Sequence, residues 1–408
     1  MSNLIIHPLF IWSMIWGSAI FLNNRYYSNL LEPFGCTFYI VVSCIFIGSL
    51  YLVVFRTVAH AAILLPDQLI DRRPDYDISK LQKYLLNIFI ILLFGYTIEI
   101  IICGWIPIVW YLGGIASDIL NYHEFGIKGL HGLFQSLYFL ATTGIFLCYL
   151  KKGNKKYLIY FVLALFISVI FITRQGIIVV LLQSAILYFL NRKVKISNII
   201  LTIGIIIANV MLFGLIGAFR TGTESFMALA QFTDKWPSWL PSGFAWVYIY
   251  ITTPLSNLDN TFNTFIPRHT LYHSICDLLP TPIRVIIYSE EELVKGSLAS
   301  TFNVSTYLVE TFQDFGIVGP IFFGILAFAL CYYVYLKAVN VKTIDYQLMY
   351  AILGQCLILS IFFNHFTFLP IMTQFVWIWI FRLYANKYSL THMDTFDKSE
   401  CILQIVGR

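Results

Sequence analysis

The sequence predicts an all-α protein that is embedded in a membrane and crosses it several times. Of its 408 residues, 59% are hydrophobic and only 12% are charged, whereas an ordinary soluble domain is about 45–50% apolar and about 25% charged. The apolar runs approach the ~20 residues that an α-helix needs to cross the hydrocarbon core. Because lipid cannot satisfy backbone hydrogen bonds, the crossing segments are expected to be helices; a β-barrel would show shorter, alternating segments.

Ten membrane spans are expected, within a single transmembrane domain that covers residues 1–408. The first apolar run begins at Leu4, with no charged residue before it and no small-residue cleavage site after it. It is therefore expected to stay as a span and not to be removed as a signal peptide. The ten spans lie at about 4–22, 35–55, 84–104, 133–150, 157–173, 176–190, 198–217, 314–336, 347–364 and 370–386.

The distribution of basic residues predicts the orientation. With the amino terminus inside, most of the 26 lysines and arginines lie on the cytoplasmic side. The positive-inside rule then predicts that both termini are cytoplasmic. The basic residues expected on the other side are Arg25, Lys128, Arg174, Arg220, Lys235, Arg268, Arg284 and Lys295.

One long loop, from Ala218 to Glu310, interrupts the apolar pattern and is expected to face the periplasm or the cell exterior. Within it, Phe244–Leu258 is apolar and aromatic but too short for a full crossing, so a re-entrant or interfacial segment is expected there. The loop's aromatic residues, among them Tyr248 and Tyr250, could stack on sugar rings or form an interfacial belt.

Two arginines are candidates for anion binding. Arg174 lies in the turn between spans of about 16 and 15 residues, which at 1.5 Å per residue are shorter than the ~30 Å hydrocarbon core, so its guanidinium is expected at membrane depth. Arg220 follows the next span. Arginine offers a rigid fork of donors for phosphate oxygens, which suits a lipid-linked diphosphate. The alternatives are that Arg174 snorkels or pairs with Glu99, and that Arg220 pairs with lipid phosphate.

Histidines and carboxylates of the loop are candidates for acid–base chemistry. If the segment is helical, His269, His273 and Asp277 share one face at spacing i, i+4, i+8. That face could hold a divalent metal, orient His273 as a general base, or be the polar side of an interfacial helix; no metal is expected. Glu310 and Asp314 are spaced i, i+4 where the eighth span begins, and the helix dipole there favours negative charge.

Several functional classes lack their motifs. The sequence has no G-x-x-x-x-G-K-[ST], no G-x-G-x-x-G and no H-E-x-x-H, which argues against an ATP-driven pump, a dinucleotide enzyme and a zincin. Asp75-Tyr76-Asp77 could hold a metal in a nucleotide-sugar transferase, but no α/β domain can form around it and a solvated loop is expected. The eight scattered cysteines are expected to pack as small hydrophobic residues. Neither a cofactor nor a nucleic-acid partner is expected.

Five stretches, taken in order, give the chain a resemblance to a known family. They are Glu124–Gly132, Thr173–Gly176, Gly217–Arg220, Tyr248–Asn257 and Asn303–Gly319. Together these stretches resemble the Wzy-type O-antigen polymerases, also called oligosaccharide repeat unit polymerases. The resemblance covers residues from about 84 to 386. The arginine-x10-glycine pattern of some members is not found from Arg174, Arg220, Arg268 or Arg284.

The resemblance implies a glycosyltransferase of the bacterial inner membrane, with its active site facing the periplasm. Its substrates would be oligosaccharides linked to undecaprenyl diphosphate, and the growing chain would be transferred to a new lipid-linked repeat unit. Membrane lipid is a further implied partner, and a chain-length regulator stays open. The residues implied in catalysis are Arg174, Arg220, His273, Glu310 and Asp314. Those implied in binding substrate are Arg268, Arg284, Tyr248, Tyr250, Asn257 and Asn303.

Two other functions stay open at this point. An O-antigen ligase would use the same donor but pass the glycan to lipid A–core. A transporter of polysaccharide or lipid-linked oligosaccharide would place charges along a path inside the spans, where Glu99 is the one charged residue noted well inside a span.

Overall fold

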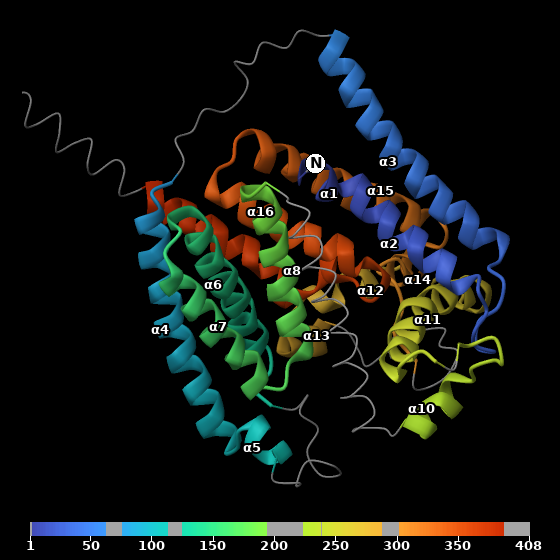
Figure 1. The fold of residues 1–408 in the computed structure, drawn as a ribbon, viewed down its shortest axis with the longest axis horizontal. Helices are drawn as coiled ribbons and strands as arrows, with labels where there is room; N and C mark the ends of the chain where they lie inside the picture. The colour runs from blue at the N-terminus through green and yellow to red at the C-terminus, as the bar shows by residue number, and fades with distance from the viewer. Residues whose placement is uncertain are drawn as a thin grey trace, which may run out of the picture. The chain divides into compact units, whose positions relative to one another are not determined.

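The computed structural model describes residues 2–62, 76–112, 125–193, 223–237, 239–287 and 302–386 (Figure 1). The regular secondary structure of these residues is helical, and an isolated antiparallel bridge joins Ser28 to Phe232. The chain divides into two compact units. The first unit comprises Met1–Ile70, Arg192–Leu336 and Leu353–Phe368, and the second comprises Asp71–Asn191, Lys337–Ile352 and Leu369–Arg408.

Among the described residues, five helices are long and apolar enough to cross a membrane. This confirms the prediction of a helical membrane protein. The five are Cys36–Val58 within α3 (Cys36–Ala62), α4 (Ile78–Cys103), α6 (Leu130–Lys152), α15 (Val318–Asn340) and Ile344–Ile361, which contains α16 (Ile344–Ile358).

In the first unit, α2 (Pro8–Asn23) and α11 (Ser242–Thr264) pack together, and α11 also contacts α3. Proline at the first helical position suits α2 because its missing N–H would have no helical acceptor. The buried amide nitrogen of Asn23 donates to Ser256 Oγ at 2.8 Å and to the Thr252 carbonyl at 3.3 Å. These bonds hold α11 against α2.

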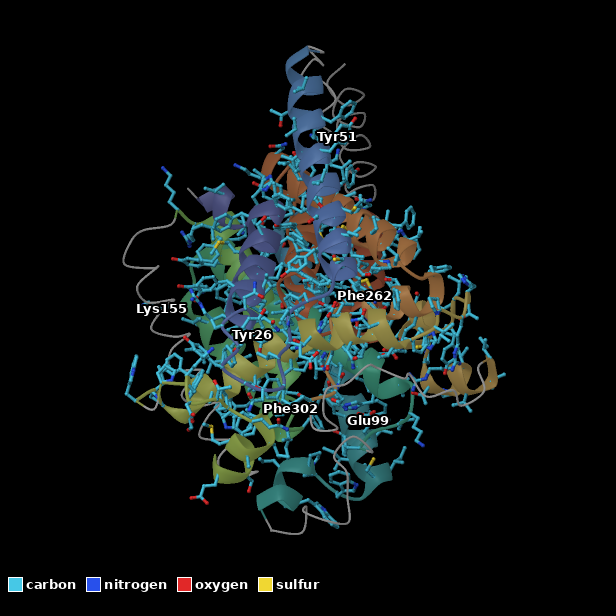
Figure 2. The ribbon with its side chains drawn as sticks, turned by 90° about the vertical axis from the view of Figure 1, so that its right-hand side faces the viewer. Tyr26, Tyr51, Glu99, Lys155, Phe262 and Phe302 are labelled. Atoms are coloured by element: carbon cyan, nitrogen blue, oxygen red, sulfur yellow. The ribbon has the colours of Figure 1, made fainter. Side chains whose placement is uncertain are left out.

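An aromatic cluster anchors the loop segments of the first unit to α11. The rings of Phe226, on α10 (Thr223–Ala230), and Trp246 stack with their centroids 3.5 Å apart. Phe302 and Tyr26, both labelled in Figure 2, belong to the same cluster. Burial of these large rings supplies the hydrophobic energy that orders this polar part of the chain.

In the second unit, α6 packs against α4, α7 (Lys155–Ile170) and α8 (Arg174–Asn191) (Figure 1). A further helix covers 369–386. Its Trp377 donates from the indole nitrogen to Ser136 Oγ at 3.0 Å and accepts at its carbonyl from the Tyr84 hydroxyl at 2.7 Å. These bonds join this helix to α6 and α4.

Two predicted segments have different boundaries in the structure. The expected span at 314–336 is two helices, α14 (Val309–Phe315) and α15, because Gly316 adopts a backbone φ of +63° that ends α14. The expected short segment Phe244–Leu258 is part of the 23-residue helix α11. The predicted span at 198–217 lies outside the described residues.

Candidate functional site

The strongest candidate site lies in the first unit, where α12 (Tyr272–Ile275) packs against α14. Asp314 Oδ1 is 2.8 Å from His273 Nδ1 and accepts from the His273 backbone N–H at 3.1 Å. It also accepts from Thr270 Oγ1 at 3.1 Å, while Oδ2 accepts from the Ser274 N–H at 2.7 Å. A single buried carboxylate therefore binds two backbone N–H groups of α12 and a hydroxyl just before it.

These hydrogen bonds keep Asp314 ionised. Burial disfavours the charged form of the carboxyl, but the hydrogen bonds from His273 and Ser274 outweigh that penalty and lower the pKa of Asp314 below its ordinary value. An ionised carboxylate accepts a hydrogen bond from the N–H at His273 Nδ1, and in that tautomer of the neutral ring Nε2 carries the lone pair. The arrangement is that of a histidine oriented for proton acceptance.

The second ring nitrogen of His273 is buried and makes no hydrogen bond with the described residues. The His273 side chain has no exposed surface, and its ring meets the edges of Phe265 and Tyr272 at centroid distances of 6.1 and 5.1 Å. A buried polar nitrogen without a partner costs about 1–3 kcal/mol. Such an atom is what a general base needs in order to accept a proton from a substrate.

Glu310 lies one helical turn before Asp314 on α14 and is also buried. Cys276 follows α12, and burial together with the charges of Asp277 and Glu310 raises the pKa of its thiol to about 12. The thiol therefore stays protonated at neutral pH and is not a nucleophile. Three residues chosen from the sequence, His273, Glu310 and Asp314, thus come together in one buried cluster.

The carboxylate that orients His273 was not the expected one. The predicted common face of His269, His273 and Asp277 is wrong, because α12 is only four residues long and His269 has a left-handed backbone with φ of +54°. His269 is exposed, and Asp277 pairs with Arg284 at 3.1 Å. The partner of His273 comes instead from a helix 41 positions further along the chain.

The other loop residues chosen from the sequence lie at several places. Arg268 is exposed, and its backbone N–H donates to the Gln313 carbonyl at 2.9 Å. Arg284 forms the ion pair with Asp277 and is half-buried. Asn303 is exposed. The backbone of Arg268 therefore lies beside α14, the helix of the carboxylates.

Two of the expected binding residues have structural partners. Asn257 is buried and donates to the carbonyls of Phe302 and Val304 at 2.6 and 2.7 Å. The Tyr248 hydroxyl donates to the Leu22 carbonyl at 3.2 Å and accepts from the Tyr27 N–H at 3.1 Å. Tyr250 is partly buried and stacks on Trp246. These contacts hold α11 to neighbouring chain segments.

The structure does not describe the side chains of the two arginines expected at the membrane rim. Arg174 is the first residue of α8 in the second unit, and its side chain lies outside the described part of the structure. Arg220 also lies outside the described residues. Among the described residues, no group of three or more His, Cys, Asp or Glu side chains could hold a metal ion.

No protein family, curated protein or solved structure compared with this chain matches it.

A second histidine–carboxylate pair lies in the second unit and was missed by the sequence reasoning. Glu99 is buried on α4, and its carboxylate lies 2.8 Å from His131 Nδ1 and accepts from the Ile127 N–H at 3.0 Å. His131 Nε2 lies 3.0 Å from the Gln135 amide nitrogen. The available signal was Glu99 itself, because a carboxylate within an apolar span requires a partner.

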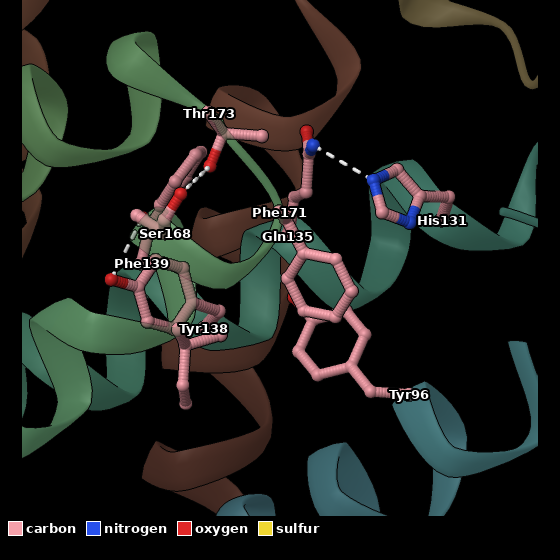
Figure 3. A pocket seen from close by; sticks show the side chains of 9 residues that line it. Tyr96, His131, Gln135, Tyr138, Phe139, Ser168, Phe171 and Thr173 are labelled. Carbon is pink, nitrogen blue, oxygen red and sulfur yellow. Dashed lines mark hydrogen bonds between the residues drawn. The ribbon is translucent and has the colours of Figure 1, made fainter. Parts of the chain in front are cut away.

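Figure 3 shows a cavity of about 10 Å³ beside this pair, within the second unit. The volume is about that needed by one water molecule. Ser168 Oγ donates to the Tyr138 hydroxyl at 2.9 Å on its wall. The lining residues are Tyr96, His131, Gln135, Tyr138, Phe139, Ile167, Ser168, Phe171 and Thr173.

Proposed function

We propose that the protein is a membrane glycosyltransferase that polymerises lipid-linked oligosaccharide repeat units, as its resemblance to the Wzy-type O-antigen polymerases implies. One observation carries the proposal. His273 is bonded through Nδ1 to the buried, ionised Asp314, while its Nε2 has no hydrogen-bond partner among the described residues. A histidine in this state can accept a proton from an alcohol, which is the step that glycosyl transfer to a sugar hydroxyl requires.

The proposed reaction is a displacement at the anomeric carbon of the donor sugar. The acceptor hydroxyl gives its proton to His273 Nε2, and its oxygen forms the new bond to the anomeric carbon. The bond between that carbon and the diphosphate oxygen breaks, and the lipid diphosphate leaves with the electron pair. Asp314 stabilises the positive charge that forms on the His273 ring.

The negative charge on the departing diphosphate would be stabilised by cationic side chains. Arg174 and Arg220 are the proposed ones, because arginine keeps its charge in poor solvent and matches phosphate oxygens with a fork of donors. Arg268 and Arg284 are further candidates, and Arg284 forms an ion pair with Asp277. Stabilisation of the leaving charge is proposed to be the main contribution of these residues.

The proposed setting is the inner membrane of a bacterium. In this proposal ten spans cross the bilayer, both termini are cytoplasmic and the loop of residues 218–310 faces the periplasm. The excess of lysine and arginine in the loops assigned to the cytoplasm supports this orientation.

The test replaces His273 by alanine in cells that lack the native copy. We expect His273→Ala to lose the long chains of surface polysaccharide and to leave a single repeat unit on lipid A–core, because removal of a general base slows transfer about 10²–10⁴-fold. The polysaccharide is resolved on a gel, and membrane abundance of each variant is measured. His269→Ala is the matched control, since His269 is exposed and four residues away, and it should keep the full ladder.

The other patterns on the gel would contradict the proposal in different ways. Unmodified core alone would favour a ligase or a transporter of lipid-linked oligosaccharide. An unchanged ladder in His273→Ala at normal abundance would exclude His273 as the base.

Loss of activity on chelation of divalent metals would contradict a displacement that needs no metal.

A further inference from the structure

The site in the first unit contains more buried polar groups without partners than the proposed proton transfer uses. Among the described residues, His273 Nε2, Ser274 Oγ and both side-chain polar atoms of Asn364 are buried and make no hydrogen bond. Most buried side-chain polar atoms in proteins have a partner, and each that lacks one costs about 1–3 kcal/mol. A group of them in one region indicates a place where a ligand supplies the missing bonds.

The fold brings Asn364 next to the segment that carries His273. Asn364 precedes the 3₁₀ helix η5 (His365–Thr367), and η5 packs against the 3₁₀ helix η3 (Cys276–Leu278). The η3 helix follows α12, the helix of His273 and Ser274. The Asn364 side chain is 2% exposed, so bulk water does not satisfy its amide. Asn364 therefore lies at the start of the element that packs against η3, the segment directly after His273 and Ser274.

The charges around this region determine which ligand suits it. Asp314 is an ionised buried carboxylate, and Glu310 lies one turn away on the same helix. His365 adds no positive charge at neutral pH, because burial lowers the pKa of its ring to about 3. Phosphate or another anion would meet like charge here, which is costly in a buried site. A neutral group that both donates and accepts hydrogen bonds meets no such penalty.

We propose that Asn364 is a binding residue for the acceptor and that its amide holds a hydroxyl group of the acceptor sugar beside His273. The inference rests on the proposed glycosyltransferase function. An amide offers one acceptor and two donors, which matches the hydroxyl groups of a sugar. The carboxylates thus keep the diphosphate of the substrate away from His273, and the neutral amide admits a hydroxyl.

The test replaces the amide by an apolar side chain of similar size. Asn364→Leu removes an unpaired amide, so we expect its melting temperature in detergent to be no lower than that of the wild type. We expect the rate of chain extension at low substrate to fall about tenfold, through a higher KM. The substrate is lipid-linked repeat unit extracted from cells that lack this gene. Asn364→Ala repeats the test without the bulk of leucine.

Asn257→Leu is the matched control for stability. The Asn257 amide is also buried but donates to two carbonyls, so its removal should lower the melting temperature clearly. If the melting temperatures of Asn364→Leu and Asn364→Ala both fell as far as that of Asn257→Leu, Asn364 would have a structural partner. That result would overturn the inference. Unchanged kinetics in stable Asn364 variants would mean that a buried water fills the site, and would overturn it too.

The same experiment separates this inference from the proposed function. If purified wild-type protein does not extend the lipid-linked repeat unit, the proposed function and the inference both fail. If the wild type extends it and Asn364→Leu does so equally well, only the role of Asn364 fails.

Discussion

At the residue scale, Asp314 and His273 show how one buried carboxylate can serve both folding and chemistry. Asp314 accepts hydrogen bonds from two backbone N–H groups and a hydroxyl besides the His273 ring. The backbone bonds hold the ends of α12 and α14 together, and the ring bond fixes the direction of His273. Loss of the carboxylate charge therefore affects stability as well as activity.

This double role predicts how stability depends on pH. The pKa of Asp314 is lower in the folded protein than in the unfolded chain. Its contribution is therefore complete above the unfolded value of about 3.8 and is lost as the pH falls through the folded value. We expect Asp314→Asn to be less stable than the wild type at neutral pH by about 1–3 kcal/mol, with a difference that shrinks below about pH 4.

Thermal unfolding in detergent between pH 3 and 7 measures this difference. His365 also makes stability depend on pH, and it does so equally in the wild type and in Asp314→Asn. Its pKa is about 3 in the folded protein and about 6.5 in the unfolded chain. Both proteins therefore lose stability as the pH falls from about 6.5 to about 3. A difference between wild type and Asp314→Asn that does not change with pH would contradict an ionised Asp314.

At the element scale, the junction of α14 and α15 sets the position of both carboxylates. Gly316 ends α14, and the first turn of α15 folds back so closely that a Cβ on Gly319 would lie 2.0 Å from the Thr311 carbonyl oxygen. That contact involves backbone, which cannot move aside by a rotamer change. The absence of a side chain at Gly319 is thus required for the geometry of the site.

We expect Gly319→Ala to separate the first turn of α15 from α14 and to destabilise the protein by about 1–3 kcal/mol. Gly17→Ala is the matched control, because Gly17 lies in α2 with nothing within 4 Å of the added Cβ. Alanine there should be neutral or slightly stabilising, as expected in an open helix position. Melting temperatures of the two variants decide between these expectations, and equal values would contradict the close contact at Gly319.

At the scale of the whole molecule, the proposed orientation assigns each loop to one side of the membrane. Lys155 and His269 are both exposed and are predicted to lie on opposite sides. We expect a cysteine that replaces His269 to react with an impermeant maleimide once the outer membrane is opened, and one that replaces Lys155 to react only after the inner membrane is disrupted. Labelling of both from the same side would contradict the predicted topology.

Much of the element pattern follows from the sequence. Apolar runs of about 20 residues at low charge can lie only in lipid or in a core, and the helices α3, α4, α6 and α15 correspond to such runs. The extension of α11 beyond its apolar part was not predictable in this way. Polar residues such as Asn257 and Asp259 are kept in that helix by bonds to distant backbone, which local periodicity does not report.

The sequence by itself determined the helical membrane class and offered His269, His273, Asp277, Glu310 and Asp314 as candidates for acid–base chemistry. The tertiary structure decided which of them act together. Asp314 instead of Asp277 orients His273, and η5 packs against η3, because packing of short helices brings together positions far apart in the chain. Sequence periodicity predicts neighbours at i+3 and i+4 within one helix. Hydrogen bonds between helices depend on how the chain folds back on itself.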